Sequence, residues 1–100
     1  MVIITQLIYI KPGQELVFQQ FETIALKALE RYQGQLLLRV RPDADSFITA
    51  NIEKPYEIHL VSFPSENLWK NFAGDEERKK FLHLKEQSIQ SVLLIKGSEI

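Results

Sequence analysis

Four segments of this sequence combine the residues typical of β-strands with apolar side chains on both faces. They are residues 2–10, 35–41, 56–63 and 91–96. Successive side chains of a strand point to opposite faces, so a sheet with one face in water normally alternates apolar and polar residues. The runs 36–38 (Leu-Leu-Leu) and 92–95 (Val-Leu-Leu-Ile) do not alternate. The apolar side chains on both faces of the predicted sheet therefore have to be buried against other parts of the protein or a partner.

Two helical regions separate these strands. The first covers residues 14–32 and ends before Gly34, a favourable C-terminal cap. Its apolar stripe consists of Val17, Phe21, Ile24, Ala28 and Tyr32. The second region follows Ser65, a favourable N-terminal cap, and is interrupted at Gly74 before Asp75 starts another helix. The chain therefore contains two helical crossovers.

The order of these elements, β-α-β-β-α-β, predicts the topology. With right-handed crossovers, it gives an antiparallel four-stranded sheet with the helices on one face, which is the ferredoxin-like arrangement of the α+β class. We expect residues 1–100 to form a single domain, since 100 residues suit one core. Segment 47–52 lies between the turn residues 42–46 and Pro55, and is expected to form a short extra strand or to lie along the surface.

The second face of the sheet predicts a homodimer. Helices on one face leave the other face in water, with an apolar patch of several hundred Å², more than a soluble monomer usually exposes. At ~25 cal/mol per Å², burying this patch yields on the order of ten kcal/mol before the cost of association. We therefore expect two sheets to pack face to face as a dimeric α+β barrel.

Composition argues against several classes of partner. The net charge is −1 and the basic residues are spread among acids, whereas a nucleic-acid binder usually has a basic patch. The chain has no cysteine, which excludes thiol catalysis and thiolate metal sites. Residues 1–10 resemble a strand and not a signal peptide, and no apolar stretch approaches the length of a membrane span. We expect a cytoplasmic protein without a membrane or nucleic-acid partner.

The sequence also predicts no metal and no cofactor. Its two histidines, His59 and His83, are far apart, and the chain has neither an H-x-H motif nor a glycine-rich phosphate loop. His83 lies in a charged helix and is expected to be solvated.

A candidate catalytic pair lies on neighbouring strands. His59 stands in the middle of an apolar strand, where an imidazole can act as a base or a proton donor. Arg39 suits a carboxylate or phosphate ligand, and Gln6 interrupts an apolar strand as a group that faces a polar pocket does. The structural alternatives are a hydrogen-bonded buried histidine, an ion pair of Arg39 with Glu57 or Glu22, and an interface amide at Gln6.

Three aromatic residues are candidates for the wall of a ligand cavity. Tyr32, Trp69 and Phe72 come from the two helical regions and face the sheet in the predicted fold. Aromatic side chains at helical spacing are more often part of a simple core, which remains the alternative.

Several motifs resemble a bacterial family of uncharacterised dimeric α+β barrel proteins, distantly related to the antibiotic-biosynthesis monooxygenases. The motifs span nearly the whole chain: Lys-Pro-Gly-Gln-Glu (11–15), Phe-x-x-Phe-Glu (18–22), Gly-Gln-Leu-Leu-Leu-Arg-Val-Arg-Pro (34–42), Glu-Ile-His-Leu-Val-Ser-Phe-Pro-Ser (57–65) and Asp-Glu-Glu-Arg (75–78). The resemblance implies a dimer with a ligand cavity between sheet and helices. It carries over no established activity.

The wider superfamily implies two enzymatic comparisons. Several of its members oxidise aromatic polyketides without a cofactor. Others degrade heme with an asparagine on the first strand, a tryptophan on the second helix and a histidine further on. In this chain the first strand has no asparagine, and Phe72 and Leu82 stand at the positions of the tryptophan and the histidine. Heme degradation is therefore not expected. Two hypotheses remain, a homodimer that binds a small hydrophobic or aromatic ligand, and a cofactor-independent monooxygenase or isomerase.

Overall fold

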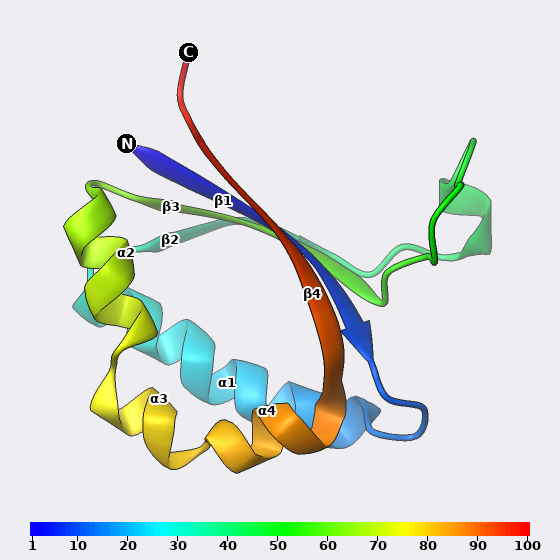
Figure 1. Ribbon diagram of the computed structural model, residues 1–100, viewed down its shortest axis with the longest axis horizontal. Helices are drawn as coiled ribbons and strands as arrows, with labels where there is room; N and C mark the ends of the chain where they lie inside the picture. The colour runs from blue at the N-terminus through cyan, green and yellow to red at the C-terminus, as the bar shows by residue number, and fades with distance from the viewer.

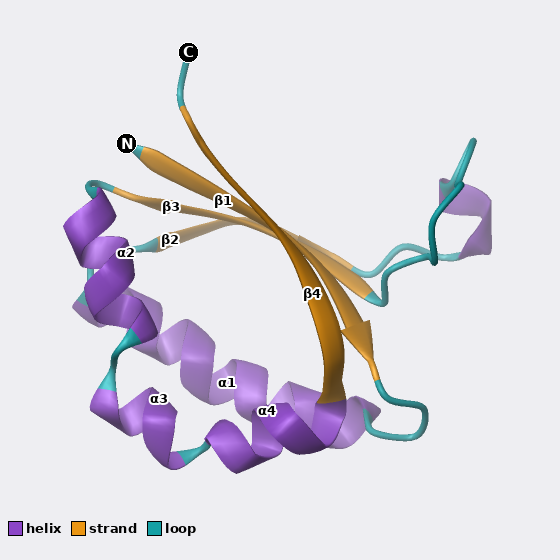
Figure 2. Cartoon of the chain, in the orientation of Figure 1, coloured by secondary structure: helices purple, strands orange, loops and turns teal.

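The computed structural model describes all 100 residues and forms one antiparallel sheet with its helices on one side (Figures 1 and 2). The sheet order is β2-β3-β1-β4. In chain order the elements are β1 (Val2–Ile10), α1 (Glu15–Arg31), β2 (Gln35–Val40), a 3₁₀ turn (Ala44–Ser46), β3 (Glu57–Phe63), α2 (Glu66–Ala73), α3 (Glu76–Lys80), α4 (Leu82–Ser88) and β4 (Ile89–Ser98). The predicted ferredoxin-like architecture is confirmed.

The second helical region is more divided than the sequence pattern predicts. Ser65 caps α2 by accepting a hydrogen bond from the Leu68 amide, and Gly74 ends that helix. Asp75 then caps α3 by accepting from the Arg78 amide, as expected. The next break, at Phe81, separates α3 from α4. Three short helices can follow the curved sheet, which one straight helix could not do (Figure 1).

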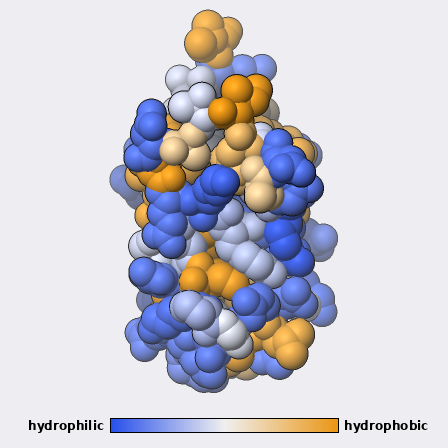
Figure 3. Space-filling view, turned by 90° about the vertical axis from the view of Figure 1, so that its right-hand side faces the viewer, coloured by the Kyte–Doolittle hydropathy of each residue, from blue (hydrophilic) through white to orange (hydrophobic).

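The segment between β2 and β3 forms no extra strand. It contains the 3₁₀ turn, and in Figure 1 it projects away from the sheet on the side opposite the chain termini. Asp43 and Ser46 form a reciprocal capping box around this turn. Residues 47–52 are mostly exposed and belong to this projecting segment, so they neither form the short extra strand nor lie along the surface as expected. At the end of the molecule turned toward the viewer in Figure 3, hydrophilic side chains surround a few separate hydrophobic patches.

The inner face of the sheet packs on α1. Ile4 and Ile8 of β1 and Val61 and Phe63 of β3 are buried there, against a stripe of α1 residues. The buried apolar residues of that stripe are Phe18, Phe21, Ala25, Ala28 and Leu29. Gly34 allows the chain to pass close to this core, because a Cβ there would lie 2.8 Å from the Phe63 ring.

The outer face of the sheet is apolar and open. Leu38, Leu93 and Ile95 are 46%, 48% and 54% exposed. In the strand register, Leu38 lies opposite Leu60, and Leu93 lies opposite Leu7. All of these side chains point away from the helices. No helix of the structure has both the length and the apolar character that crossing a membrane requires.

Candidate functional site

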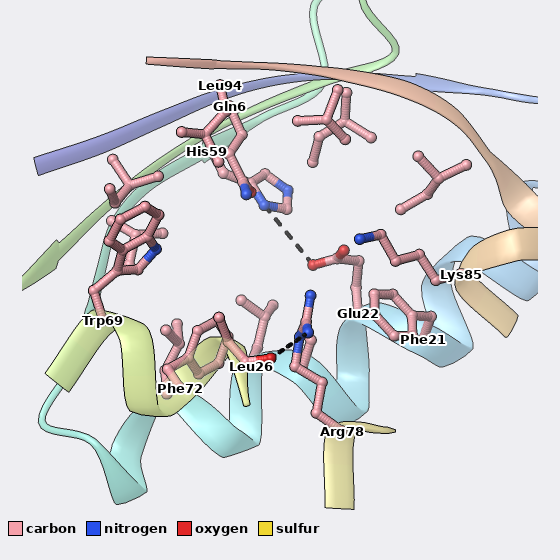
Figure 4. Close-up of a pocket in the computed structure, with 18 of the residues that line it drawn as sticks. Gln6, Phe21, Glu22, Leu26, His59, Trp69, Phe72, Arg78, Lys85 and Leu94 are labelled. Carbon is pink, nitrogen blue, oxygen red and sulfur yellow. Dashed lines mark hydrogen bonds and ion pairs between the residues drawn. The ribbon is translucent and has the colours of Figure 1, made fainter. Parts of the chain in front are cut away.

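A cavity of about 290 Å³ separates the inner face of the sheet from the helices. Most of its wall is apolar, with Trp69 and Phe72 of α2 at one end (Figure 4). The sheet contributes Gln6 and His59, which lie directly opposite each other in the pairing of β1 with β3. The polar groups of the site therefore stand on one wall of an otherwise hydrophobic space.

Three further charged side chains reach the same cavity from the helices. They are Glu22 of α1, Arg78 of α3 and Lys85 of α4. In Figure 4 Glu22 and Lys85 point inward on the side away from Trp69, and Arg78 points inward between Glu22 and Phe72. No group of three or more histidine and acidic side chains in the chain is close enough to hold a metal ion. The cavity thus has an aromatic end and a charged end.

His59 is fixed by a buried carboxylate. Its Nε2 lies 2.7 Å from Oε1 of Glu57, and both side chains are almost completely buried. The Arg39 Nε donates to Oε1 of Glu57 at 2.8 Å, and an Arg41 Nη2 donates to Oε2 at 2.5 Å. A carboxylate that accepts from two arginines stays ionised, so the imidazole donates to it through Nε2. In the neutral ring, Nδ1 then carries a lone pair.

The strand register explains this arrangement. Arg39 of β2 lies directly opposite His59 of β3, and Glu57 is two residues earlier on the same face as His59. Arg41 directly follows the last residue of β2, two residues after Arg39, and reaches Glu57 from there. Two strands thus place two cations and an imidazole around one acid.

The pKa values of these groups follow from burial and pairing. For Glu57, burial raises the pKa, but the hydrogen bonds from Arg39, His59 and Arg41 outweigh it, so the pKa is lowered. For His59, burial lowers the pKa, although Glu57 opposes this effect. The imidazole is therefore neutral around pH 7 and above.

Glu22 faces the free nitrogen of His59. Its Oε2 lies 3.8 Å from Nδ1, a distance slightly longer than a hydrogen bond. Burial raises the pKa of Glu22 to about 7, with Arg39 opposing the rise and Glu57 adding to it. The carboxyl group is consequently close to half protonated at neutral pH. Glu22 and His59 together form a pair that can hold or pass one proton at the cavity wall.

The structure separates the predicted site residues into two groups. His59, Gln6, Trp69 and Phe72 all line the cavity. Gln6 therefore faces the helices, and the alternative of an amide on the open sheet face does not apply.

Arg39 and Tyr32 lie outside the cavity wall. Arg39 forms the predicted structural ion pair with Glu57 and does not line the cavity. It affects His59 only indirectly, by positioning the Glu57 carboxylate that binds the imidazole. The Tyr32 hydroxyl donates to Oδ2 of Asp75 at 2.7 Å, while Arg31 donates to Oδ1. Tyr32 thus joins the end of α1 to the start of α3.

Three charged residues that line the cavity are absent from the candidates drawn from the sequence. Glu22 has a recognisable signal, since it is four residues after Phe18 and three before Ala25, inside the apolar stripe of α1. An acid at such a position is buried and needs an explanation. Arg78 and Lys85 give no such signal, because they belong to short charged helices whose orientation depends on packing.

Comparisons with known proteins support the fold. No protein-family model and no curated protein matches this sequence. Among solved structures, a protein of unknown function from Rhodopseudomonas palustris is similar, with a TM-score of 0.83 and 11% identity over 99% of this chain and 82% of that one.

Two other similar structures are described as ferredoxin-like. A dabb family protein from Mesorhizobium loti has a TM-score of 0.67 and 15% identity, and the match covers 99% of this chain and 96% of that chain. A dimeric protein of unknown function from Bacteroides fragilis has a TM-score of 0.70 and 10% identity, over 98% and 95% of the two chains. The chain shares its fold with bacterial proteins of unknown function, as the sequence resemblance implies.

Proposed function

We propose that this protein is a cytoplasmic homodimer that binds a small, largely apolar molecule between its sheet and its helices. The observation that carries this proposal is the cavity of about 290 Å³, with a mostly apolar wall and a few convergent polar groups. Such a combination is typical of small-molecule sites, and this volume is at the lower end of their range. The ligand is therefore small, with an aromatic or compact aliphatic body.

Trp69 provides a direct test of binding. It is the only tryptophan of the chain and lines the cavity, so its fluorescence reports on the site itself. Native mass spectrometry of freshly purified protein is expected to reveal a bound small molecule, and apolar probes such as 4-phenylbutanamide should change the Trp69 emission saturably. Ala25→Leu, which fills part of the cavity wall, should weaken this response. A protein that carries no molecule and responds to no probe contradicts the proposal.

The open face of the sheet supports the dimer. A row of apolar side chains that includes Leu93 and Ile95 is about half exposed there, and packing two such faces together removes both from water. The similar protein from Bacteroides fragilis is described as dimeric. We expect sedimentation to show a dimer at micromolar concentration.

A pair of variants tests where the dimer forms. Leu93→Glu places a charge on the open sheet face and should give a folded monomer. Leu16→Glu is the matched control, because Leu16 is 74% exposed on α1, away from that face. A monomeric parent protein, or equal loss of the dimer in both variants, contradicts an interface on this face.

A second candidate function is a cofactor-independent monooxygenase or isomerase that acts on an aromatic or polyketide-like molecule. The observation that favours it is the His59–Glu22 pair, in which a neutral Nδ1 faces the cavity beside a group that exchanges protons near neutral pH. His59 would remove a proton from a carbon next to a carbonyl group, leaving an enolate. An isomerase returns the proton to another carbon. In a monooxygenase, the enolate of a CH₂ group would add dioxygen at carbon to give a hydroperoxide, which loses water, so that one oxygen atom stays as a new carbonyl group and the other leaves in the water.

Hydrogen exchange tests this second candidate without a known substrate. Phenylacetone in D₂O should exchange its acidic C–H positions faster with the protein than in buffer, as followed by proton NMR. His59→Gln should abolish the acceleration while leaving probe binding at Trp69 intact. Exchange at the buffer rate, or full exchange with the His59 variant, removes the support for this function.

A further inference from the structure

The charged end of the cavity holds more positive than negative charge. Arg78 and Lys85 face the cavity there, and Glu22 is the one acid that shares this wall with them. Glu57 does not contribute a free negative charge, because it is paired with Arg39 and Arg41. Cations enclosed by apolar walls are unfavourable unless a partner of opposite charge joins them.

Arg78 is held in place but incompletely satisfied. Its guanidinium carbon lies 5.7 Å from the centre of the Phe21 ring and 5.4 Å from that of Phe72, so the group is positioned between two rings. One terminal nitrogen donates to the carbonyl oxygen of Ala73 at 3.3 Å. Its Nε is buried and has no hydrogen-bond partner. Most buried polar nitrogen atoms have one, which points to a missing acceptor.

Lys85 is also without a negative partner. It takes part in none of the ion pairs of the protein. Burial lowers the pKa of its ammonium group, and the nearby Arg78 lowers it further, while Glu22 raises it. Two cations that repel each other across a small space are a suitable setting for one bound anion.

We propose that the ligand of this cavity is a small carboxylic acid, whose apolar body lies toward Trp69 and whose carboxylate lies between Arg78 and Lys85, and that Glu22 takes up a proton when it binds. This inference rests on the proposed function, since it names the chemical class of the molecule in the same cavity. A single carboxylate suits the two cations and leaves the rest of the ligand to the apolar wall. A dianion would place more negative charge beside Glu22.

The proton uptake follows from the groups around Glu22. The cationic neighbours are Arg39, Arg78 and Lys85, the acidic neighbour is Glu57, and the neutral His59 ring faces its Oε2. A ligand carboxylate between Arg78 and Lys85 adds negative charge beside Glu22. It also weakens the electrostatic stabilisation that both cations give to the ionised form of Glu22. The ionised form of Glu22 then repels the ligand, and the protonated form accepts it.

This coupling has a measurable size. Since the pKa of free Glu22 is about 7, its protonated fraction falls about tenfold from pH 6 to pH 8. The apparent affinity for a carboxylate should fall by about the same factor, because only the protonated form binds it well. A neutral ligand of the same shape should show no such dependence.

The experiment compares two matched probes by Trp69 fluorescence. One is 4-phenylbutanoate, which is ionised throughout this pH range, and the other is its neutral amide, 4-phenylbutanamide. At pH 6 we expect the carboxylate to bind at least about tenfold more tightly than the amide. At pH 8 the carboxylate should bind about tenfold more weakly than it does at pH 6. Titration calorimetry in two buffers of different ionisation enthalpy should show uptake of a proton near pH 7.5 with the carboxylate alone.

Three variants identify the groups responsible. Glu22→Gln should bind the carboxylate with an affinity that is constant within about twofold from pH 6 to pH 8. Lys85→Met should lose at least about tenfold in carboxylate affinity and keep the affinity for the amide. Lys80→Met is the matched control, because Lys80 is exposed on α3 and does not line the cavity. Circular dichroism checks that each variant is folded.

The outcomes separate the two proposals. If neither probe changes the Trp69 emission and no molecule is co-purified, the proposed function fails, and this inference fails with it. If at pH 6 both probes bind equally well, or the amide binds better, the cavity binds ligands but the carboxylate inference is overturned. Carboxylate binding that is independent of pH in the parent protein overturns the role of Glu22.

Discussion

Replacing Glu22 with glutamine should change the way in which stability depends on pH. Burial raises the pKa of this carboxyl group from 4.5 to about 7 in the folded protein. Its contribution to stability is therefore complete below about pH 4.5 and is lost as the pH rises through 7, because the unfolded chain releases its proton more readily. Glutamine is neutral at every pH and removes this loss.

The size of the effect follows from the two pKa values. Each pKa unit corresponds to about 1.4 kcal/mol, so the shift from 4.5 to about 7 is worth about 3.4 kcal/mol above pH 8. Because the unfolded chain has already lost part of its protons at pH 5, about 2.5 kcal/mol of this falls between pH 5 and pH 8. His59 acts in the opposite direction, since burial lowers its pKa, and it affects both proteins alike.

Urea unfolding at pH 5 and pH 8, at one fixed protein concentration, measures this prediction. The free energy of unfolding of Glu22→Gln minus that of the parent protein should be about 2.5 kcal/mol more positive at pH 8 than at pH 5. Glu30→Gln is the control, because Glu30 is exposed on the same helix. A difference that is the same at both pH values refutes the account of a buried, partly protonated Glu22.

Three further substitutions test the contacts around the site. Glu57→Gln removes the acid that accepts hydrogen bonds from Arg39, Arg41 and His59. Because the two arginines are partly exposed, it should lower the free energy of unfolding by about 1.5–3 kcal/mol, and a loss below about 0.5 kcal/mol in urea unfolding contradicts the network. Tyr32→Phe removes the 2.7 Å hydrogen bond to Asp75 and should lower the melting temperature, with unchanged ligand binding at Trp69. Gly34→Ala places a methyl group 2.8 Å from the Phe63 ring and should destabilise the protein by about 1–3 kcal/mol in the same assay, whereas a neutral result shows that the ring moves aside easily.

Local patterns were sufficient for the architecture. The spacing of apolar residues locates α1, and the lack of alternation in segments 36–38 and 92–95 correctly predicts an open apolar face on a four-stranded sheet. These signals are reliable because hydrophobic periodicity acts within one element. The break at Phe81 between α3 and α4 has no comparable signal, since neither glycine nor proline marks it.

Only part of the candidate site could be predicted from the sequence. His59 and Gln6 could be recognised as polar residues in apolar strands, and Trp69 and Phe72 as an aromatic helix face. Arg39 was a reasonable partner for His59, but both side chains bind the Glu57 carboxylate, so Arg39 orients this acid and does not line the cavity.

The chain order and the period of its apolar residues determine which face of each element is buried, and this information is local. Which charged groups meet in the cavity depends on how three short helices pack across the curved sheet. Glu22, Arg78 and Lys85 are as much as 63 residues apart in the chain, and only packing brings them to one wall. Their protonation depends on the water that this packing removes, a property that no single segment of the sequence contains.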